Sequence, residues 1–431
     1  MREELLQVPA IAEAVRRHAA ETGMSETDAW RRVREYIREI VPFFNIIAYY
    51  QVGYRLGDAL LRLFYKVSVE YEDREALERM PRDSVLVYLM NHRSNADYVL
   101  VSYALAGHVA ISYAVGEWAR AFPLEYVFKA FGAYFVRRRY REALYHVVLE
   151  SYVQLITRRG VTQGIFLEGG LTRDGKLRAP KLGLLDYVLG IGRDPAFPAR
   201  MYVVPVAVNY DRVLEDRSLL AELAAAKDGQ RTSRLTQVRE VGRYVVWNLG
   251  RMLTSRWQRY GRAAVTIGRP VPLAPWFARH PTVFELTRSE RLACVQALCD
   301  EIMETIGTLI PVTPVPLACA AIQSLELDFI PRARLLERMG DMRDVLVELN
   351  GRVIHADRGI DETFERAARM LRMRRILIED GSGFAVAPGN RVLISYYANS
   401  IAHLLGPFSR AVRERDALPA ETAFRVHPPI P

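Results

Sequence analysis

The sequence predicts an α/β fold in which a central mixed β-sheet is flanked by helices. From residue 67 onward, short apolar runs rich in β-branched and aromatic residues alternate with helical segments, as in a sheet covered by helices. The chain has 431 residues and is 50% hydrophobic, enough for a large core. Helical patterns dominate before residue 67 and after residue 310. We therefore expect N-terminal helices, an α/β domain and a mainly helical C-terminal region.

Residues 1–66 are predicted to form a helical, membrane-associating region. Residues 8–39 have the pattern of two helices, the second opened by a cap at Ser25. Within 43–66 the polar residues make one narrow stripe on an otherwise apolar and aromatic helix. That helix either packs into the core or lies in a membrane interface, and the pattern does not decide. The opening residues indicate a charged helix rather than a signal peptide. The sequence has no run of 18 apolar residues, so it does not predict a simple transmembrane helix. The stripe consists of Gln51, Arg55, Asp58, Arg62 and Lys66.

Residues 67–310 are predicted to form the α/β domain. Its helices are expected from about residue 97 and near 118–131, 140–158, 182–191 and 284–306. Its strands are expected at 67–71, 84–90, 108–115, 132–136, 163–168, 201–210 and 263–273.

Residues 311–431 are predicted to form a helical region with one β-hairpin. Three prolines at 311–316 mark the boundary, and residues 380–383 (DGSG) suit the hairpin turn. Helices followed by an arginine-rich hairpin are also compatible with a winged helix that binds nucleic acid. We favour packing against the α/β domain, because residues 395–405 are too apolar to be left exposed. No nucleic-acid partner is expected.

Charge and cysteine content narrow the partners and the compartment. The net charge of +9 favours anionic partners, such as a phospholipid surface or a phosphorylated substrate. Cys294, Cys299 and Cys319 have neither metal-ligand spacing nor the pattern of a disulfide framework. We therefore expect a reducing compartment and no metal site.

The stretch from Tyr88 to Leu105 contains the first candidate site. An apolar strand ends in Asn-His, and Asp97 follows His92 by five residues at the start of a helix. A carboxylate there can accept from one imidazole nitrogen and leave the other basic, which suits deprotonation of a hydroxyl that attacks a carbonyl. Alternatively, Asp97 caps the helix and His92 bonds a loop carbonyl. Taken alone, so short a pattern favours the second interpretation.

Three later segments could form a site for an anionic ligand. A strand ends in three arginines, Arg137 to Arg139, whose guanidinium groups suit phosphate, although a solvated basic strand end gives the same pattern. Residues 164–183 place glycines and basic residues after a strand, either around a ligand or in a flexible loop. These glycines match no dinucleotide or P-loop motif, so no such cofactor is expected. In the apolar run 203–213, Pro205 suggests an edge, an end or a bulge.

Together and in this order, the four segments resemble the glycerolipid acyltransferase superfamily. The matching positions are His92/Asp97, Gly132/Phe135/Arg137, Phe166/Glu168/Gly169 and Pro205. Further stretches, including "NHRSNADYVLVSYAL", "DGKLRAPKLGLLD" and "SYYANSIAHLL", resemble the bacterial glycerol-3-phosphate acyltransferase branch. The likeness runs from about residue 66 to 406.

The resemblance implies transfer of a fatty acyl group from acyl-CoA or acyl-carrier protein to the sn-1 hydroxyl of glycerol 3-phosphate, on the cytoplasmic face of an anionic membrane. His92 would be the general base and Asp97 its orienting carboxylate. No metal, cofactor or covalent enzyme intermediate is implied, since the thioester is a co-substrate. The acceptor phosphate would be held by Arg93, Arg137, Arg173 and Lys176, in a pocket shaped by Ser94, Glu168, Gly169, Gly170 and Pro205.

Two departures from the family pattern concern the acceptor. Leu171 stands where the family pattern usually has an arginine. If nothing replaces the hydrogen bond from that arginine to the phosphate, phosphate binding is weaker by about 1.5–3 kcal/mol. Arg138, Arg139 or Arg178 could substitute, or the acceptor could be a lysophospholipid, dihydroxyacetone phosphate or another alcohol. Asn95 and Ala96 also replace the residues that often flank the base in bacterial relatives. The alternative to an enzyme is a membrane protein without catalytic activity.

Overall fold

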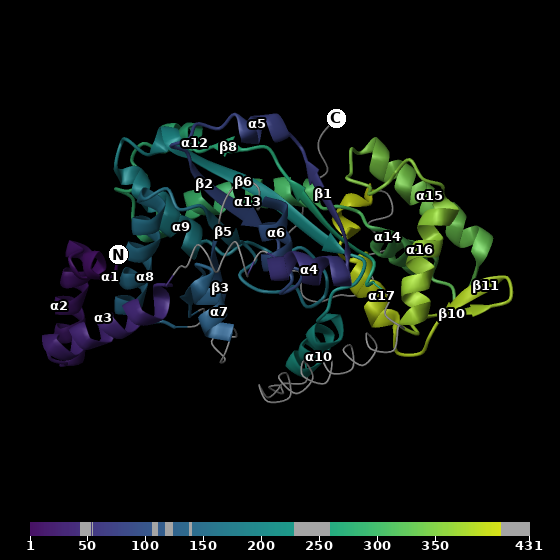
Figure 1. Cartoon of the computed structure of the whole chain (residues 1–431), viewed down its shortest axis with the longest axis horizontal. Coiled ribbons are helices and arrows are strands. Elements are labelled where there is room, and N and C mark those ends of the chain that lie inside the picture. The colour runs from purple at the N-terminus through teal and green to yellow at the C-terminus, as the bar shows by residue number, and fades with distance from the viewer. Residues whose placement is uncertain are drawn as a thin grey trace.

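The computed structural model describes residues 1–43, 53, 55–105, 111–116, 124–137, 140–227 and 259–406. It confirms the predicted fold class: a central, mostly parallel mixed sheet is flanked by helices (Figure 1). Within these residues, no helix is both long enough and apolar enough to cross a bilayer.

The central sheet has the strand order β1-β7-β6-β2-β5-β3-β4, with the short β8 paired to β6. Only the pairs that β6 makes with β7 and β8 are antiparallel. The strands are β1 (Lys66–Tyr71), β2 (Val85–Met90), β3 (Ser112–Gly116), β4 (Tyr134–Val136), β5 (Gln163–Phe166), β6 (Met201–Tyr210), β7 (Arg262–Ile267) and β8 (Val271–Pro272).

Helices pack along this sheet as the alternating pattern predicts. Helix α6 lies near β7, α13 packs on β6, and α8 packs on α9. The helices of this part are α4 (Arg55–Phe64), α5 (Arg74–Glu78), α6 (Asp97–Leu105), α7 (Leu124–Ala130), α8 (Ala143–Arg158), α9 (Gly183–Leu189), α10 (Asp216–Lys227), α12 (Ala274–Arg279) and α13 (Arg288–Leu309).

Three N-terminal helices, α1 (Arg2–Leu6), α2 (Pro9–Thr22) and α3 (Glu26–Ile40), lie at one end of the molecule (Figure 1). Ser25 caps α3 as predicted, its side chain accepting from the Asp28 N–H. Helices α2 and α3 pack against α8, and the hydroxyls of Tyr36 and Tyr140 hydrogen-bond at 2.9 Å. The membrane-interface segment predicted within 43–66 lies partly outside the described residues; of it, the structure describes residues 43, 53 and 55–66, which include α4.

The C-terminal region lies at the other end of the molecule (Figure 1). The predicted hairpin is present, and β9 adds a third antiparallel strand to it. Helices α15, α16 and α17 pack around α14, which is almost entirely buried. The elements are α14 (Pro314–Leu325), β9 (Phe329–Pro331), α15 (Arg332–Glu348), α16 (Ile360–Met373), β10 (Leu377–Asp380), β11 (Gly383–Val386) and α17 (Arg391–Ala398). The three-part division at residues 66 and 310 stays a prediction.

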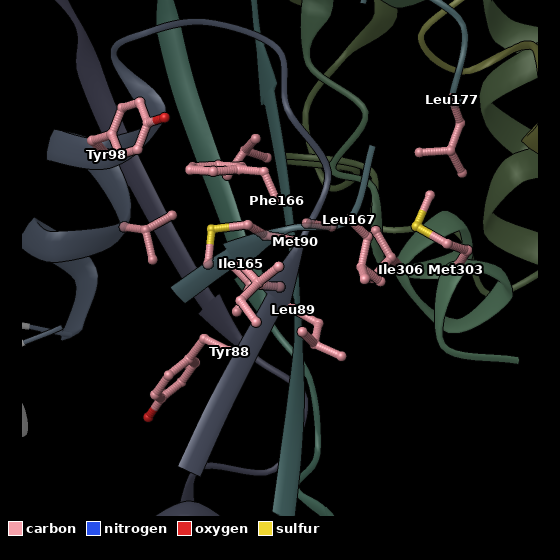
Figure 2. Close-up of a cluster of buried hydrophobic side chains, with 14 of the residues drawn as sticks. Tyr88, Leu89, Met90, Tyr98, Ile165, Phe166, Leu167, Leu177, Met303 and Ile306 are labelled. Atoms are coloured by element: carbon pink, nitrogen blue, oxygen red, sulfur yellow. The ribbon is translucent and has the colours of Figure 1, made fainter. Parts of the chain in front are cut away.

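Apolar side chains fill the space around the ends of β2 and β5 (Figure 2). Leu89 and Ile165 are paired across the two strands, and both are almost fully buried. Met303 and Ile306 of α13 belong to the same core. The polar residues that follow β2 and β5 are thus supported from below by close packing.

Pro205 does not lie at an edge of the sheet, because β6 is an interior strand between β2 and β7. It pairs with Leu89 on one side. On the other side it lies between the β8 pairing, which ends at Val203, and the β7 pairing, which begins at Val206. The missing proline N–H therefore costs no ladder bond, while the Pro205 carbonyl accepts from the Gly268 N–H at 2.8 Å.

Candidate active site

The candidate site lies where three neighbouring parallel strands end. Strand β2 is paired to β5 on one side and to β6 on the other, and both pairs are parallel. Their carboxyl ends therefore meet at one edge of the sheet, the usual place for sites in α/β folds. His92 follows β2, Glu168 follows β5, and Tyr210 ends β6. The Asn91 side chain joins two of these ends through hydrogen bonds to the backbone N–H and carbonyl of Val208.

His92 and Asp97 form a buried hydrogen-bonded pair. The His92 Nδ1 lies 2.9 Å from Asp97 Oδ2, and the two residues are 1% and 0% exposed. Because a carboxylate accepts, Nδ1 is the donor of this bond, and in the neutral imidazole Nε2 then holds the lone pair. The turn is closed by the same oxygen, which also accepts the backbone N–H groups of Arg93 and Ser94. Asp97 thus both starts α6 and orients the imidazole, so the two interpretations of this pattern are compatible.

Two further residues hold this turn from the end of β6 and the segment after it. The Tyr210 hydroxyl donates to Asp97 Oδ1 at 2.6 Å. Glu215 accepts from the Ser94 hydroxyl at 2.8 Å and from the Asn95 N–H at 3.1 Å. Burial raises the pKa of the Glu215 carboxyl, and its two donors oppose that shift.

Aromatic rings fix the plane of the His92 imidazole. Phe166, the last residue of β5, stacks on it with ring centroids 3.9 Å apart. Tyr98 of α6 meets both rings edge-on. Figure 2 shows Phe166 and Tyr98 above the strand ends. This packing limits rotation of the imidazole beyond what one hydrogen bond would do.

Glu168 is a buried carboxyl that contacts the backbone of the His92–Asp97 turn. It accepts the His92 N–H at 2.8 Å on one oxygen and the Arg178 N–H at 3.1 Å on the other. Burial raises its pKa to about 8, and the two N–H donors and the positive charges of Arg93 and Arg178 oppose the shift. Glu168 therefore joins the β2 end to the loop after β5, a role distinct from simply lining a pocket.

The loop after β5 is tied to the turn and to the C-terminal region. Gly169 has a φ of +64° and is half-buried beside Gly170. The Thr172 N–H donates to the His92 carbonyl at 3.2 Å. Gly175 has a φ of +86°, and a Cβ there would lie 1.9 Å from the Tyr396 carbonyl oxygen, so no other residue fits without moving α17.

Arg93 points into this junction. Its Nη1 donates to the Gly175 carbonyl at 2.6 Å, and its guanidinium lies 5.0 Å from the ring centroid of Tyr396. Arg93 is 2% exposed, and together with Glu168 and Lys176 it lines a small, tight pocket beneath the turn. Two of the four predicted phosphate ligands, Arg93 and Lys176, thus lie close together.

Arg137 is held by the N-terminal helices. Its guanidinium makes two hydrogen bonds to Glu39 of α3, at 2.7 and 2.5 Å. It also lies over the rings of Tyr36, Tyr140 and Tyr145, at 5.6, 4.7 and 5.7 Å from their centroids. A phosphate at Arg137 would have to share this guanidinium with Glu39.

The remaining predicted residues are distributed around the loop. Arg173 is 45% exposed in its side chain and pairs with Glu222 at 3.2 Å. Leu171 packs partly buried against the core, and its carbonyl accepts from Arg178 Nη1 at 3.4 Å. Arg178 therefore lies beside Leu171, whereas Arg138 and Arg139 lie outside the described residues.

Tyr210 and Glu215 are not among the site residues predicted from the sequence. Tyr210 ends an apolar strand and Glu215 follows it, and polar residues at a strand end are a signal that could have been used. The missing information was that β6 lies next to β2. Within the part of the chain that the structure describes, no group of three or more histidine, cysteine and acidic side chains could hold a metal ion.

Comparison with known proteins gives two family matches that do not overlap. Residues 69–209 match the model described as "Acyltransferase", and residues 246–410 match "Glycerol-3-phosphate acyltransferase C-terminal region". The glycerol-3-phosphate acyltransferase of Actinobacillus succinogenes is 27% identical over 417 residues, and that of Pasteurella multocida is 28% identical over 422 residues. Each alignment covers 93% of this chain and 49% of the relative, so the chain spans about half the length of these curated relatives.

A crystal structure of a 1-acyl-sn-glycerophosphate acyltransferase from Thermotoga maritima overlaps more loosely. Its TM-score is 0.33 at 17% identity, and the overlap covers 71% of this chain and 98% of that one. So loose a likeness does not bear on the fold or the function.

The buried His92–Asp97 pair at the strand ends lies within the region that matches the acyltransferase model. The second match and the named relatives narrow the likeness. Over 93% of its length, the chain is similar to the glycerol-3-phosphate acyltransferases named above.

Proposed function

We propose that the protein transfers a fatty acyl group from a thioester donor, acyl-CoA or acyl-carrier protein, to the sn-1 hydroxyl of glycerol 3-phosphate. The observation that carries the proposal is the hydrogen-bonded His92–Asp97 pair, buried at the joined ends of β2, β5 and β6. The names of the relatives support the acceptor. The Phe166 stack and the Asp97 hydrogen bond supply the fixed orientation that a general base needs.

In the proposed reaction, His92 Nε2 takes the proton from the acceptor hydroxyl as its oxygen attacks the thioester carbonyl. A carbon–oxygen bond forms, and the carbonyl oxygen carries the negative charge of a tetrahedral intermediate. When the intermediate collapses, the carbon–sulfur bond breaks and the sulfur takes the proton from the imidazolium. Asp97 stays ionised throughout and stabilises the imidazolium through Nδ1, as in other base–carboxylate pairs.

The acceptor phosphate is proposed to bind among the basic residues that follow β2, β4 and β5. Arg93 and Lys176 line one pocket, and Arg178 lies beside Leu171. Arg137 and Arg173 stay in the proposed set, but each has a carboxylate partner, Glu39 or Glu222, with which a phosphate would compete. Ser94, Glu168, Gly169, Gly170 and Pro205 are proposed to shape the pocket and its supports.

Thiol release from acyl-CoA tests the function, measured with glycerol 3-phosphate, its 1-acyl product and dihydroxyacetone phosphate as alternative acceptors. We expect the highest kcat/KM with glycerol 3-phosphate. A higher value with either other acceptor would favour the second candidate function, acylation of that molecule, which Leu171 motivates. No release with any of these acceptors would contradict the proposed function and leave a non-catalytic membrane protein as the better interpretation.

Leu171→Arg is expected to lower the KM for glycerol 3-phosphate by about tenfold, since one charge-assisted hydrogen bond to a phosphate is worth about 1.5–3 kcal/mol. Steady-state kinetics over a range of acceptor concentrations measures this. The control is Leu182→Arg, because Leu182 is also a half-buried leucine but lies outside the proposed pocket. An unchanged or higher KM in Leu171→Arg would show that Leu171 is not near the phosphate.

We also propose that the protein binds the surface of an anionic membrane peripherally, on its cytoplasmic face. Leu56 and Leu60 of α4 are 56% and 43% exposed. Phe43 and Tyr126, whose rings lie 6.3 Å apart, are 46% and 61% exposed. Apolar and aromatic side chains on a protein of net charge +9 suit an anionic interface.

Flotation with anionic liposomes at physiological salt tests this membrane proposal. We expect the wild type to float and the double variant Leu56→Ser/Leu60→Ser to float several-fold less, because apolar area at the interface is lost. The matched control is Val347→Ser/Leu349→Ser, which removes two exposed apolar side chains near the end of α15. Equal flotation of the two double variants would contradict a binding face at α4.

A further inference from the structure

We infer that Tyr210 and Glu215 are positioning residues for the catalytic pair: they hold the His92–Asp97 turn in its working geometry from the β6 side. The inference rests on the proposed function for its kinetic consequence. Its structural part concerns the hydrogen bond between His92 and Asp97 and can be measured separately.

Both carboxylate oxygens of Asp97 accept hydrogen bonds. Oδ2 accepts three N–H groups, from His92 Nδ1 and from the backbone of Arg93 and Ser94, at 2.9, 2.7 and 3.0 Å. Oδ1 has the Tyr210 hydroxyl at 2.6 Å. Tyr210 is therefore the contact that fixes the rotation of the carboxylate about its Cβ–Cγ bond from the side away from the turn.

The hydrogen bond from Tyr210 to Asp97 depends on the protonation of the Tyr210 hydroxyl. Burial raises its pKa, and the negative charge of Asp97 and the hydrogen bond to it raise it further. Both effects favour the protonated hydroxyl, which donates to Asp97. A donor on a carboxylate draws charge away from the other oxygen, so Tyr210 also sets how strongly Asp97 holds the His92 N–H.

Glu215 holds residues 94–96 of the turn. It lies five residues after Tyr210, and its two oxygens accept from the Ser94 hydroxyl and the Asn95 N–H. The Ser94 hydroxyl in turn accepts from the Ala96 N–H at 3.1 Å. A shift of residues 94–96 toward or away from His92 would therefore break a partly buried hydrogen bond.

Tyr210 and Glu215 belong to one rigid segment, residues 209–216. Asn209 donates to the Pro311 carbonyl at 3.0 Å, and Asp211 accepts the N–H groups of Arg262 and Val315 at 2.8 and 3.0 Å. The hydroxyl of Tyr397 accepts the Val213 N–H at 3.1 Å. The segment is thus fixed to β7 and to the C-terminal region, which gives that region a part in shaping the site.

The test is Tyr210→Phe, with Tyr65→Phe as the matched control. The Tyr65 hydroxyl donates at 2.8 Å to the Arg212 carbonyl, and its ring lies 5.5 Å from that of Tyr210. Both substitutions remove one buried hydroxyl from the same aromatic cluster, but only one of those hydroxyls bonds Asp97. We expect Tyr210→Phe to lower kcat about tenfold with little change in either KM, because only the alignment of the base is disturbed. Tyr65→Phe should keep the wild-type kcat.

A second measurement does not depend on turnover. In protein labelled with ¹⁵N-histidine, the Nδ1–H signal of His92 is assigned by its loss in His92→Ala. We expect this signal to shift in Tyr210→Phe and in Glu215→Gln, and to keep its position in Tyr65→Phe. A signal that is the same in the wild type, Tyr210→Phe and Glu215→Gln would overturn the inference, whether or not the wild type transfers acyl groups. Absence of transfer in the wild type would overturn the proposed function alone.

Discussion

Asp97→Asn is expected to lower kcat for acyl transfer by about 10²- to 10⁴-fold, the range typical for general acid–base catalysis. The asparagine oxygen can replace Oδ2 and keep its three N–H donors, and the amide nitrogen then faces the Tyr210 oxygen, which can accept. The turn therefore keeps its shape while the negative charge beside the imidazole is lost. Without that charge, the imidazolium formed during attack is less stable.

Initial rates of thiol release measure this effect, and the urea midpoint shows whether the variant is folded. Asp83→Asn is the control, because Asp83 is 64% exposed in its side chain and pairs with Arg200 on the surface. We expect it to keep the wild-type rate. An Asp97→Asn enzyme with more than half of the wild-type kcat would contradict an orienting, charge-stabilising role for Asp97.

Arg374→Met is expected to lower the free energy of unfolding by about 3–5 kcal/mol, since it leaves the buried Asp216 without its cationic partner. Arg374 follows α16 and pairs with Asp216, the first residue of α10, at 2.6 Å. Both side chains are almost fully buried, and the Tyr397 hydroxyl of α17 bonds both of them. This cluster joins the C-terminal region to the segment that contacts the His92–Asp97 turn.

Urea unfolding of the wild type and two variants measures this loss. The control is Arg391→Met, which breaks the exposed pair with Asp328 and should cost at most about 1 kcal/mol. If Arg374→Met and Arg391→Met are equally stable, the buried cluster does not fasten the C-terminal region. Reduced kcat in a folded Arg374→Met enzyme would further connect that region to the site.

Much of the architecture follows from local pattern. Strands β2 (VLVYLM) and β6 (MYVVPVAVNY) are mostly apolar runs that suit a covered sheet, and β5 (QGIF) ends in Ile and Phe, so their positions could be predicted from the sequence. The turn at His92 and Asp97 could also be predicted from local pattern, because the end of a strand and the start of a helix are only a few residues apart. The sequence could not decide whether the predicted helix within 43–66 packs into the core or lies in a membrane interface, since an amphipathic pattern does not say what covers its apolar faces.

Contacts between distant segments could not be predicted. Arg137 and Glu39 are 98 residues apart, and nothing local in either segment indicates that α3 supplies a carboxylate to the end of β4. Tyr210 and Asp97 are 113 residues apart and meet only because β6 is the neighbour of β2. The order of strands in a sheet depends on the whole fold, so the sequence could not decide among an edge, an end and a bulge for Pro205. It lies in an interior strand where the pairing passes from β8 to β7.

The most direct test of the central claim is the rate of thiol release from acyl-CoA in the presence of glycerol 3-phosphate, compared between the wild type and His92→Ala. The account predicts transfer by the wild type and almost none by a His92→Ala protein that keeps the wild-type urea midpoint. A His92→Ala protein that transfers acyl groups at the full rate would contradict the claim that His92 is the catalytic base.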